Sequence, residues 1–319
     1  MRILTAVLAA LIVAVVAGCS APADDDAGGS VQLNLPDGRS VTIPHTPQRI
    51  VTLGGQWTDV LLSFGRKPVG YYDAIQTTAH QLPPWYGTEL ADSTPLDPNG
   101  DIVAAVATLK PDLIVAPGFA SMSGVFDKLT ELAPTIDKIS GAQVDPWPDM
   151  VTLMGTILHQ PDKAKEIIAG VDGKIGAIAN EYPGLKGKTY SFAYMYGSDQ
   201  ISVLGDPNDG AGKLFASLGL TMAPRLIQQS RTSGQPRVQI SAENIPWLNS
   251  DLLVMATQTD DLRTRLESLP GYRNLASVKT GAVAMLNQMQ ITGLNEPAPK
   301  ATVYVLDQLR PALARAAGQ

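Results

Sequence analysis

The sequence predicts an α/β protein with two lobes joined by a long helix. Three observations favour this class. Short β-branched runs alternate with helical patterns in both halves, the stretch from residue 148 to about residue 180 shows helical periodicity alone, and 45% of the 319 residues are hydrophobic. At roughly 100 to 200 residues per domain, a chain of this length accommodates two packed lobes.

Composition excludes several classes of protein. The formal net charge of -6 argues against a nucleic-acid surface, which needs clustered Lys and Arg. A single cysteine cannot form an internal disulfide or a cysteine-based zinc cluster. Three separate histidines, His45, His80 and His159, leave little for a histidine metal site, so we expect no directly bound metal and no cofactor.

Residues 1–18 have the order of an export signal, with Arg2, then an uncharged apolar run, then small residues. The sequence Val16-Ala17-Gly18-Cys19 resembles a bacterial lipobox, which implies cleavage before Cys19 and lipid attachment to its sulfur. An uncleaved anchor or a buried thiol is the alternative. Residues 19–30 are small, polar and acidic, which is typical of a flexible tether. We therefore expect an exported protein anchored to the membrane on its extracytoplasmic side.

The N-terminal lobe is expected over residues 31–147. Two alternating segments around Pro36-Asp37-Gly38 predict a hairpin. A strand at residues 49–53 ends in glycines and precedes a helical pattern, and Pro68 begins a second such unit. Helical residues 100–109 stop at Lys110-Pro111-Asp112, and a buried-type strand follows. This alternation predicts a parallel sheet covered on both faces.

The linker helix is expected over residues 148–182, with an apolar stripe interrupted at His159-Gln160-Pro161. A second series of strands and helices is expected over residues 183–297, the C-terminal lobe, in which strands begin near Thr189, Ile201, Asp251 and Val283. Residues 298–319 form a C-terminal helix. The two halves are thus expected to repeat one plan.

Several short motifs resemble the periplasmic-binding-protein family that captures iron-siderophores, haem and cobalamin for ABC importers. They run in the family's order through residues 43–51, 98–103, 109–115 (Leu109-Lys110-Pro111-Asp112-Leu113-Ile114-Val115), 205–219, 240–243, 269–279 and 305–309. The resemblance implies two Rossmann-like lobes joined by a long linker helix, the class III arrangement, with ligand in the cleft between the lobes. It also implies one acidic permease-docking residue per lobe. The family's glutamates are not cleanly matched here, and Asp127 and Asp209 are neighbouring substitutes.

Ligands of open parallel sheets bind beyond the carboxyl ends of the strands, so residues that follow predicted strands are the binding candidates. Rings of Trp and Tyr pack on planar groups, and guanidinium groups pair with carboxylate or hydroxamate oxygens. The stretch from Arg225 to Arg237 is interpreted as a basic loop that traps an anionic chelate, and a phenolate of Tyr194 or Tyr196 as a possible iron ligand. The ligand-binding candidates are Gln56, Trp57, Tyr71, Tyr72, Trp85, Phe119, Tyr194, Tyr196, Arg225, Arg231 and Arg237.

The leading hypothesis is a lipid-anchored receptor that binds a ferric (Fe3+) siderophore and delivers it to an ABC-transporter permease. Haem or cobalamin binding by the same fold is the alternative. Hypotheses of another class are a secreted hydrolase or reductase and a scaffold lipoprotein. The chain lacks a Gly-x-Ser-x-Gly elbow, a Walker loop, a dinucleotide fingerprint and a His-Glu-x-x-His motif, so we expect no enzyme. We expect a monomer that contacts the membrane through its lipid and binds no nucleic acid.

Overall fold

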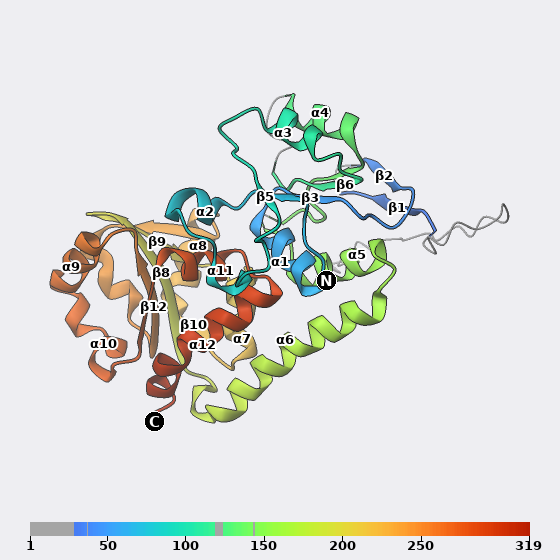
Figure 1. Cartoon of the computed structure of the whole chain (residues 1–319). Helices are drawn as coiled ribbons and strands as arrows, with labels where there is room; N and C mark the ends of the chain where they lie inside the picture. Colours follow the sequence, from blue (N-terminus) through green and yellow to red (C-terminus); the bar gives the residue numbers. More distant parts are fainter. Residues whose placement is uncertain (1–28, 37, 119–123, 143) are drawn as a thin grey trace, which may run out of the picture. The chain divides into compact units, whose positions relative to one another are not determined.

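The computed structural model describes residues 29–36, 38–118, 124–142 and 144–319. They form two compact units (Figure 1). The first holds the described residues up to Tyr72 together with residues 89–165, and the second holds residues 73–88 and 166–319. The chain therefore crosses between the units three times, after Tyr72, after Thr88 and inside the helix α6 (Pro161–Glu181).

The first unit contains a five-stranded sheet in the order β5-β4-β3-β6-β7, with every neighbouring pair parallel. Helices α3 and α4 cover one face of this sheet, and α1 and α5 cover the other (Figure 1). The expectation of a parallel sheet covered on both faces is confirmed for this unit. The elements are β3 (Ile50–Thr52), β4 (Gly70–Tyr71), β5 (Thr94–Pro95), β6 (Leu113–Val115), β7 (Thr135–Ile136), α1 (Gly55–Ser63), α3 (Ile102–Thr108), α4 (Val125–Leu132) and α5 (Trp147–Ile157).

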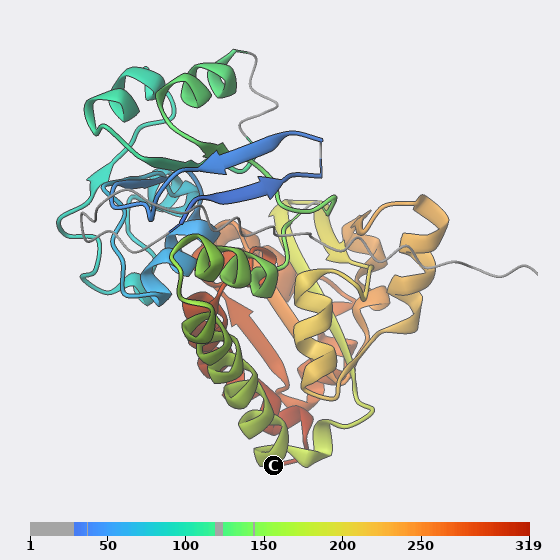
Figure 2. The same cartoon turned by 90° about the vertical axis from the view of Figure 1, so that its right-hand side faces the viewer.

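The predicted hairpin is present as β1 (Val31–Asn34) and β2 (Ser40–Ile43), which pair antiparallel and form a ribbon of their own (Figure 2). An Asp-Gly pair between alternating segments is a strong sequence signal of a hairpin.

The Lys-Pro-Asp motif joins the amino ends of two strands. Both carboxylate oxygens of Asp112 accept backbone N–H groups, from Gln48 at 2.7 Å and from Arg49 at 2.8 Å. The Arg49 guanidinium donates in return to the carbonyl oxygen of Leu109. These bonds fix the register of β3 against β6, and they leave the opposite, carboxyl ends of the strands for other side chains.

The expected linker consists of two helices, α5 and α6. They are separated at Leu158–Gln160, where His159 has a left-handed φ of 54°. Pro161 begins α6, as the break in the sequence pattern predicted, because proline is favoured in the first turn of a helix. The 21 residues of α6 span about 32 Å at 1.5 Å per residue.

The second unit contains a mixed sheet in the order β11-β9-β8-β12-β13, and β10 pairs with β8 as well. β9 runs antiparallel to both β8 and β11. The prediction that both halves repeat one βα plan is therefore wrong at this point. Only Ser198 and Asp199 separate β8 from β9, and two residues cannot hold the crossover that parallel strands require.

Helices cover both faces of this second sheet. Figure 1 shows α9 and α10 on one side and α7, α11 and α12 on the other. The strands are β8 (Thr189–Gly197), β9 (Gln200–Leu204), β10 (Thr221–Met222), β11 (Arg237–Ile240), β12 (Leu252–Thr257) and β13 (Val283–Leu286). The helices are α2 (Ala74–Ala79), η1 (Pro84–Tyr86), η3 (Pro183–Leu185), α7 (Gly210–Ser217), α8 (Pro224–Ser233), η4 (Ala242–Leu248), α9 (Asp260–Ser268), η5 (Tyr272–Asn274), α10 (Ala276–Thr280), α11 (Gln288–Asn295) and α12 (Pro299–Ala316).

Two absences concern the described residues alone. None of their helices combines the length and apolarity that a membrane span requires. They also contain no group of three or more His, Cys, Asp or Glu side chains arranged to hold a metal ion. The predicted signal segment, Cys19 and the tether up to residue 28 lie outside the described residues.

Candidate functional site

An aromatic and polar surface lies on one face of the second sheet, near the carboxyl end of β8. Tyr194 and Tyr196 point to the same face because they are two residues apart on the strand, and their ring centroids are 6.2 Å apart. The Tyr196 hydroxyl donates to Oε1 of Gln239, at 2.7 Å, on β11. Ser202 of β9 lies between Tyr194 and Gln239 in the sheet, since it pairs with Tyr194 of β8 and with Gln239 of β11.

A compensated cation adjoins this tyrosine surface. The Arg237 guanidinium lies 5.9 Å from the Phe192 ring centroid, and its Nη2 is 3.4 Å from Oδ2 of Asp209. The other Asp209 oxygen accepts the backbone N–H of Ala211 at 3.0 Å and so caps α7. Arg237 therefore faces the sheet surface with its charge already paired.

Two tyrosines of β8 are poor phenolates in this environment. Burial, with a smaller contribution from the Asp209 charge, raises the pKa of Tyr190, whose hydroxyl has no hydrogen-bond partner among the described residues. Burial alone raises the pKa of Tyr194. Direct ligation of iron by Tyr194 would thus have to overcome an unfavourable ionisation, whereas packing of its ring against a ligand carries no such cost.

The arginine stretch is not a loop. Arg225 and Arg231 lie on α8, and Arg237 is the first residue of β11. The interpretation as a basic loop is therefore wrong, and Pro224 at the start of α8 and Gly234 at its end are the sequence signals that define the helix. The Arg225 guanidinium lies 4.5 Å from the Trp247 ring centroid, which occupies one face of that side chain.

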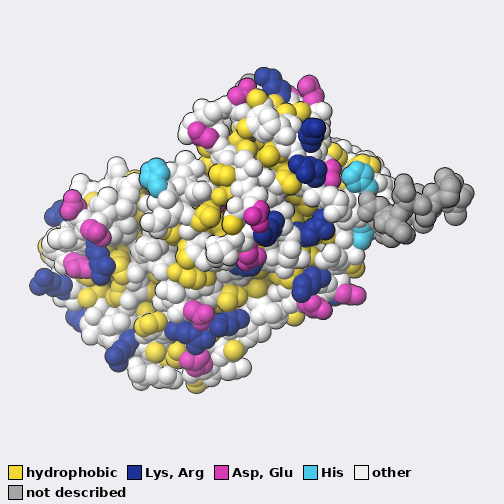
Figure 3. Space-filling model, viewed as in Figure 1, with side chains coloured by type: hydrophobic (Ala, Val, Ile, Leu, Met, Phe, Trp, Pro, Cys, Tyr) yellow, Lys and Arg dark blue, Asp and Glu magenta, His cyan; other side chains and the backbone are white. Residues whose placement is uncertain are grey.

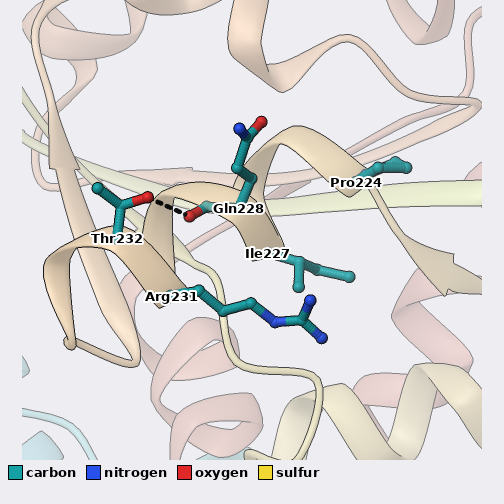
Figure 4. Close-up of a pocket in the computed structure, with 5 residues that line it drawn as sticks. All are labelled: Pro224, Ile227, Gln228, Arg231 and Thr232. Carbon is teal, nitrogen blue, oxygen red and sulfur yellow. Dashed lines mark hydrogen bonds between the residues drawn. The ribbon is translucent and has the colours of Figure 1, made fainter.

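Arg231 lines a surface pocket of about 410 Å³ with four other residues of α8 (Figure 4). Its side chain extends beside Ile227, and Thr232 donates its hydroxyl to the Gln228 carbonyl at 2.9 Å. Arg231 also lies in the last turn of α8, where the helix dipole stabilises a cation. α8 leads to Arg237, which pairs with Leu204, the last residue of β9. The residues that line this pocket include none of Tyr194, Tyr196 and Gln239.

The candidates of the first unit divide into core and surface. Trp57 is 0% exposed and Tyr71 is 3% exposed, so the structure places both in the core. Gln56 and Tyr72 are half-buried at the carboxyl ends of β3 and β4, and Gln56 donates to the Asp145 carbonyl oxygen at 3.5 Å. Phe119 lies outside the described residues. Gln56 and Tyr72 are the candidates here whose side chains remain partly accessible.

Trp85 packs within the second unit. Its ring centroid is 5.7 Å from that of Tyr304 on α12 and 6.0 Å from that of Tyr86. A Cβ on Gly293 of α11 would come to 3.2 Å from the Trp85 ring, so glycine allows this close approach. The Trp85 ring therefore stabilises the segment of residues 73–88 against α11 and α12.

The two docking candidates have different surroundings. Asp127 is exposed in the first turn of α4, where a carboxylate complements the helix dipole and is accessible to a partner. The Asp209 side chain is 16% exposed and is engaged by Arg237 and the cap of α7.

One polar residue of the tyrosine surface was missing from the sequence-based candidates. Gln239 had a detectable signal, since it alternates with the buried Val238 and Ile240. Asp73 is 2% exposed and accepts the hydroxyl of Tyr86 and the backbone N–H of Ile75, which makes it the cap of α2. An aspartate directly before a short helix is the usual sequence signal of such a cap.

Known proteins share both the sequence pattern and the fold. The sequence profile of the family described as periplasmic binding protein matches residues 71–289. A curated relative, the "Probable siderophore-binding lipoprotein YfiY" of Bacillus subtilis (strain 168), is 27% identical over 291 residues, which cover 85% of this chain and 84% of that protein.

Among solved structures, a periplasmic solute binding protein of Mycobacterium smegmatis str. MC2 155 is 28% identical with a TM-score of 0.75, over 91% of this chain and 99% of that chain. Staphylococcus aureus SirA complexed with staphyloferrin B matches in fold, with a TM-score of 0.73 at 23% identity, over 88% of this chain and 98% of that chain. The family profile covers more than half of the sequence, and the two-sheet α/β architecture agrees with it. This chain belongs to the periplasmic binding protein family.

Proposed function

We propose that this protein is an extracytoplasmic, lipid-anchored receptor that binds a ferric siderophore and delivers it to an ABC importer. The observation that carries the proposal is the similarity to the siderophore-binding lipoprotein of Bacillus subtilis, which extends over 85% of this chain. The lipobox ending at Cys19 supports the lipid anchor, because it precedes a short polar segment and a folded body.

The tyrosine surface supports a role in binding rather than catalysis. Tyr194 and Tyr196 offer aromatic faces, and the Tyr196 hydroxyl and Gln239 offer neutral hydrogen-bonding groups. Such groups recognise the organic shell of a metal chelate, in which the iron is already coordinated. Gln56 and Tyr72 offer a second polar and aromatic set at the carboxyl ends of the first sheet. Ligand binding in a cleft between the lobes stays a prediction.

Docking of the permease is proposed through Asp127. This carboxylate is exposed, whereas that of Asp209 is engaged within its own unit. Asp127→Lys should reduce iron delivery in cells and leave ligand affinity unchanged. Asp162→Lys, an exchange of an acid whose side chain is 88% exposed on α6, is the matched control.

Haem or cobalamin is the second candidate ligand of the same fold, and one titration separates it from a siderophore. The full chain in a non-ionic detergent is titrated with ferric siderophores of the hydroxamate, carboxylate and catecholate classes, with haem and with cobalamin. Tryptophan fluorescence and the thermal midpoint are followed, because a ligand that binds the native state raises that midpoint. Stabilisation by a ferric siderophore, and none by its iron-free form at equal concentration, is expected. Stabilisation by haem or cobalamin alone would replace the proposal, and no stabilisation by any ligand would reject it.

A further inference from the structure

Both ends of α6 are held, each by its own unit. At the first end, Ala164 is buried against Gly155 of α5, where an added Cβ would come to 2.6 Å from the Ala164 Cβ. The Gln160 N–H also donates to the Gly155 carbonyl oxygen at 2.7 Å. This contact between α5 and α6 lies within the first unit, which extends to Lys165. The start of α6 is therefore fixed to α5.

Ion pairs hold the other end of α6 to α12. Lys174 Nζ lies 3.2 Å from Oδ1 of Asp307. The Arg310 guanidinium donates to Asp307 at 2.9 Å and also to Glu181. Figure 3 shows Lys, Arg, Asp and Glu side chains gathered low in the view, where Figure 1 places α12 beside the second half of α6. Ile178, at 0% exposure, adds an apolar anchor, so α6 is fixed to the second unit from Lys174 onward.

The stretch between these attachments packs poorly. None of the side chains of residues 165–170 is buried. Val171, at 4% exposure, is the one buried side chain of residues 165–173, which we call the middle stretch of α6. Helices in proteins owe most of their stability to a packed face. The stability of the middle stretch therefore comes largely from its local backbone hydrogen bonds.

Glycines weaken this part of the helix further. Gly170 and Gly173 are exposed in the middle stretch, and Gly176 follows three residues later. An added Cβ would meet no atom within 4 Å at any of the three. Close packing therefore does not require these glycines, in contrast to Gly155. Glycine destabilises a helix interior because its backbone has more freedom to lose, and helices kink where water enters the ladder of backbone bonds.

The other two crossings between the units differ in the same respect. Gly87 has a left-handed φ of 54° and open space around it, and the chain returns to the first unit after Thr88. The crossing after Tyr72 is fixed on both sides. The Tyr72 N–H donates to the Thr52 carbonyl oxygen at 2.8 Å, and the Asp73 carboxylate caps α2. Two of the three connections can thus change shape at a glycine.

We propose that the middle stretch of α6 is a hinge, which opens and bends locally while both ends of the helix stay attached to their own units. Because the stretch is exposed, its backbone groups bond to water when it opens, which keeps the cost of opening low. A bend there changes the orientation of one unit against the other without disturbing either core. The hinge is a property of the chain alone, so its test needs no ligand and does not depend on the proposed function.

Hydrogen exchange of the full chain in a non-ionic detergent tests the hinge. We expect the amides of residues 166–173 to exchange at least about 10-fold faster than those of residues 174–181. Gly170→Ala combined with Gly173→Ala should slow exchange in the middle stretch at least about 5-fold, because alanine is the better helix former. Gly176→Ala, the same substitution after Lys174, is the matched control and should leave the middle stretch within about 2-fold. Uniform protection along α6, or no slowing in the double variant, would overturn the proposal.

Removal of the ion pairs separates a hinge from a helix that opens as one unit. Arg310→Met takes the guanidinium away from both Asp307 and Glu181 and keeps an unbranched side chain against the surface. We expect several-fold faster exchange of residues 174–181 and a change of at most about 2-fold in the middle stretch. An equal acceleration along all of α6 would show that the helix opens as a whole and would overturn the hinge.

Discussion

The Tyr86 hydroxyl donates to Oδ2 of Asp73 at 2.9 Å, and both side chains are buried. Asp73 is the first residue of the second unit, and its other oxygen accepts the backbone N–H groups of Ile75 and Gln76. One carboxylate thus caps α2 and fixes the aromatic segment that contains Trp85. The short insertion of residues 73–88 is held in the second unit by a polar centre as well as by its rings.

Removal of the hydroxyl should destabilise the fold. Tyr86→Phe leaves the buried Asp73 oxygen without its donor, and we expect a loss of about 1–2 kcal/mol in the free energy of unfolding. Urea denaturation measures this loss. In the Asp73→Asn background the same exchange should cost less, because a neutral amide nitrogen, not a carboxylate oxygen, then faces the Tyr86 hydroxyl. Equal costs in both backgrounds would show that the hydrogen bond is not coupled to the carboxylate.

The stability of the Asp73 site should depend on pH. Burial raises the pKa of Asp73 against the opposing effect of its hydrogen bonds, so the folded chain holds this proton more tightly than the unfolded chain. Its contribution is complete below the unfolded pKa of about 3.9 and is lost as the pH rises through the folded pKa. Asp73→Asn keeps the cap and cannot ionise, so its stability relative to the unchanged protein should increase from about pH 4 to about pH 8. A pH-independent difference in denaturation midpoints would contradict this assignment.

Glu296 is the neighbouring group that could titrate with Asp73. Desolvation of its carboxyl group raises the pKa of Glu296, and the Asp73 charge makes a smaller contribution in the same direction. Glu296→Gln is therefore the control for the pH profile. This substitution should remove the pH dependence of stability that comes from Glu296 and leave the pH dependence that comes from Asp73.

Two glycine substitutions should act in opposite directions. A Cβ at Gly212 of α7 would lie 2.5 Å from the Pro207 carbonyl oxygen, which belongs to backbone and cannot move easily. Gly212→Ala should therefore cost about 1–3 kcal/mol. Gly173 lies exposed in α6 with no atom near the added Cβ, so Gly173→Ala should gain up to about 1 kcal/mol from helix propensity. Thermal denaturation of the pair measures both, and a neutral Gly212→Ala would show that the loop before α7 can shift.

The Asp209 carboxylate should set the charge preference of the tyrosine surface. Asp209→Asn keeps an N-cap residue on α7 and leaves Arg237 without its counter-charge. Affinity for an anionic ferric chelate should rise about 3-fold to 10-fold, while that for ferrichrome should stay within about 2-fold. Asp127→Asn, which removes an equal charge from α4, should change neither. A similar gain in both variants would mean that overall charge, not Arg237, decides selectivity.

The sequence predicted those parts of the fold that have local signals. The hairpin at Asp37-Gly38, the helix stop at Pro111 and the break before Pro161 each depend on one or two residues with restricted backbones, and these elements are present. β5, β7 and β10 have two residues each, which is too short for any alternation to appear. Their existence depends on partners elsewhere in the chain.

The candidate residues were harder to predict because position after a strand does not specify direction. Trp57 and Gln56 are adjacent and both follow β3, yet one is in the core and the other is half-buried. Arg237 and Asp209 are 28 residues apart, and no local pattern indicates that they pair. Tyr194 and Tyr196 were predictable as sharing a face, because alternation along one strand determines it.

Calorimetric titration of the full chain with ferric siderophores, repeated with Tyr196→Ala, tests the central claim most directly. We predict one ferric siderophore bound per chain with a dissociation constant of about 1 μM or lower, weakened at least about 10-fold by the substitution. No binding of any ferric siderophore, or an unchanged affinity in the folded Tyr196→Ala variant, would contradict the account.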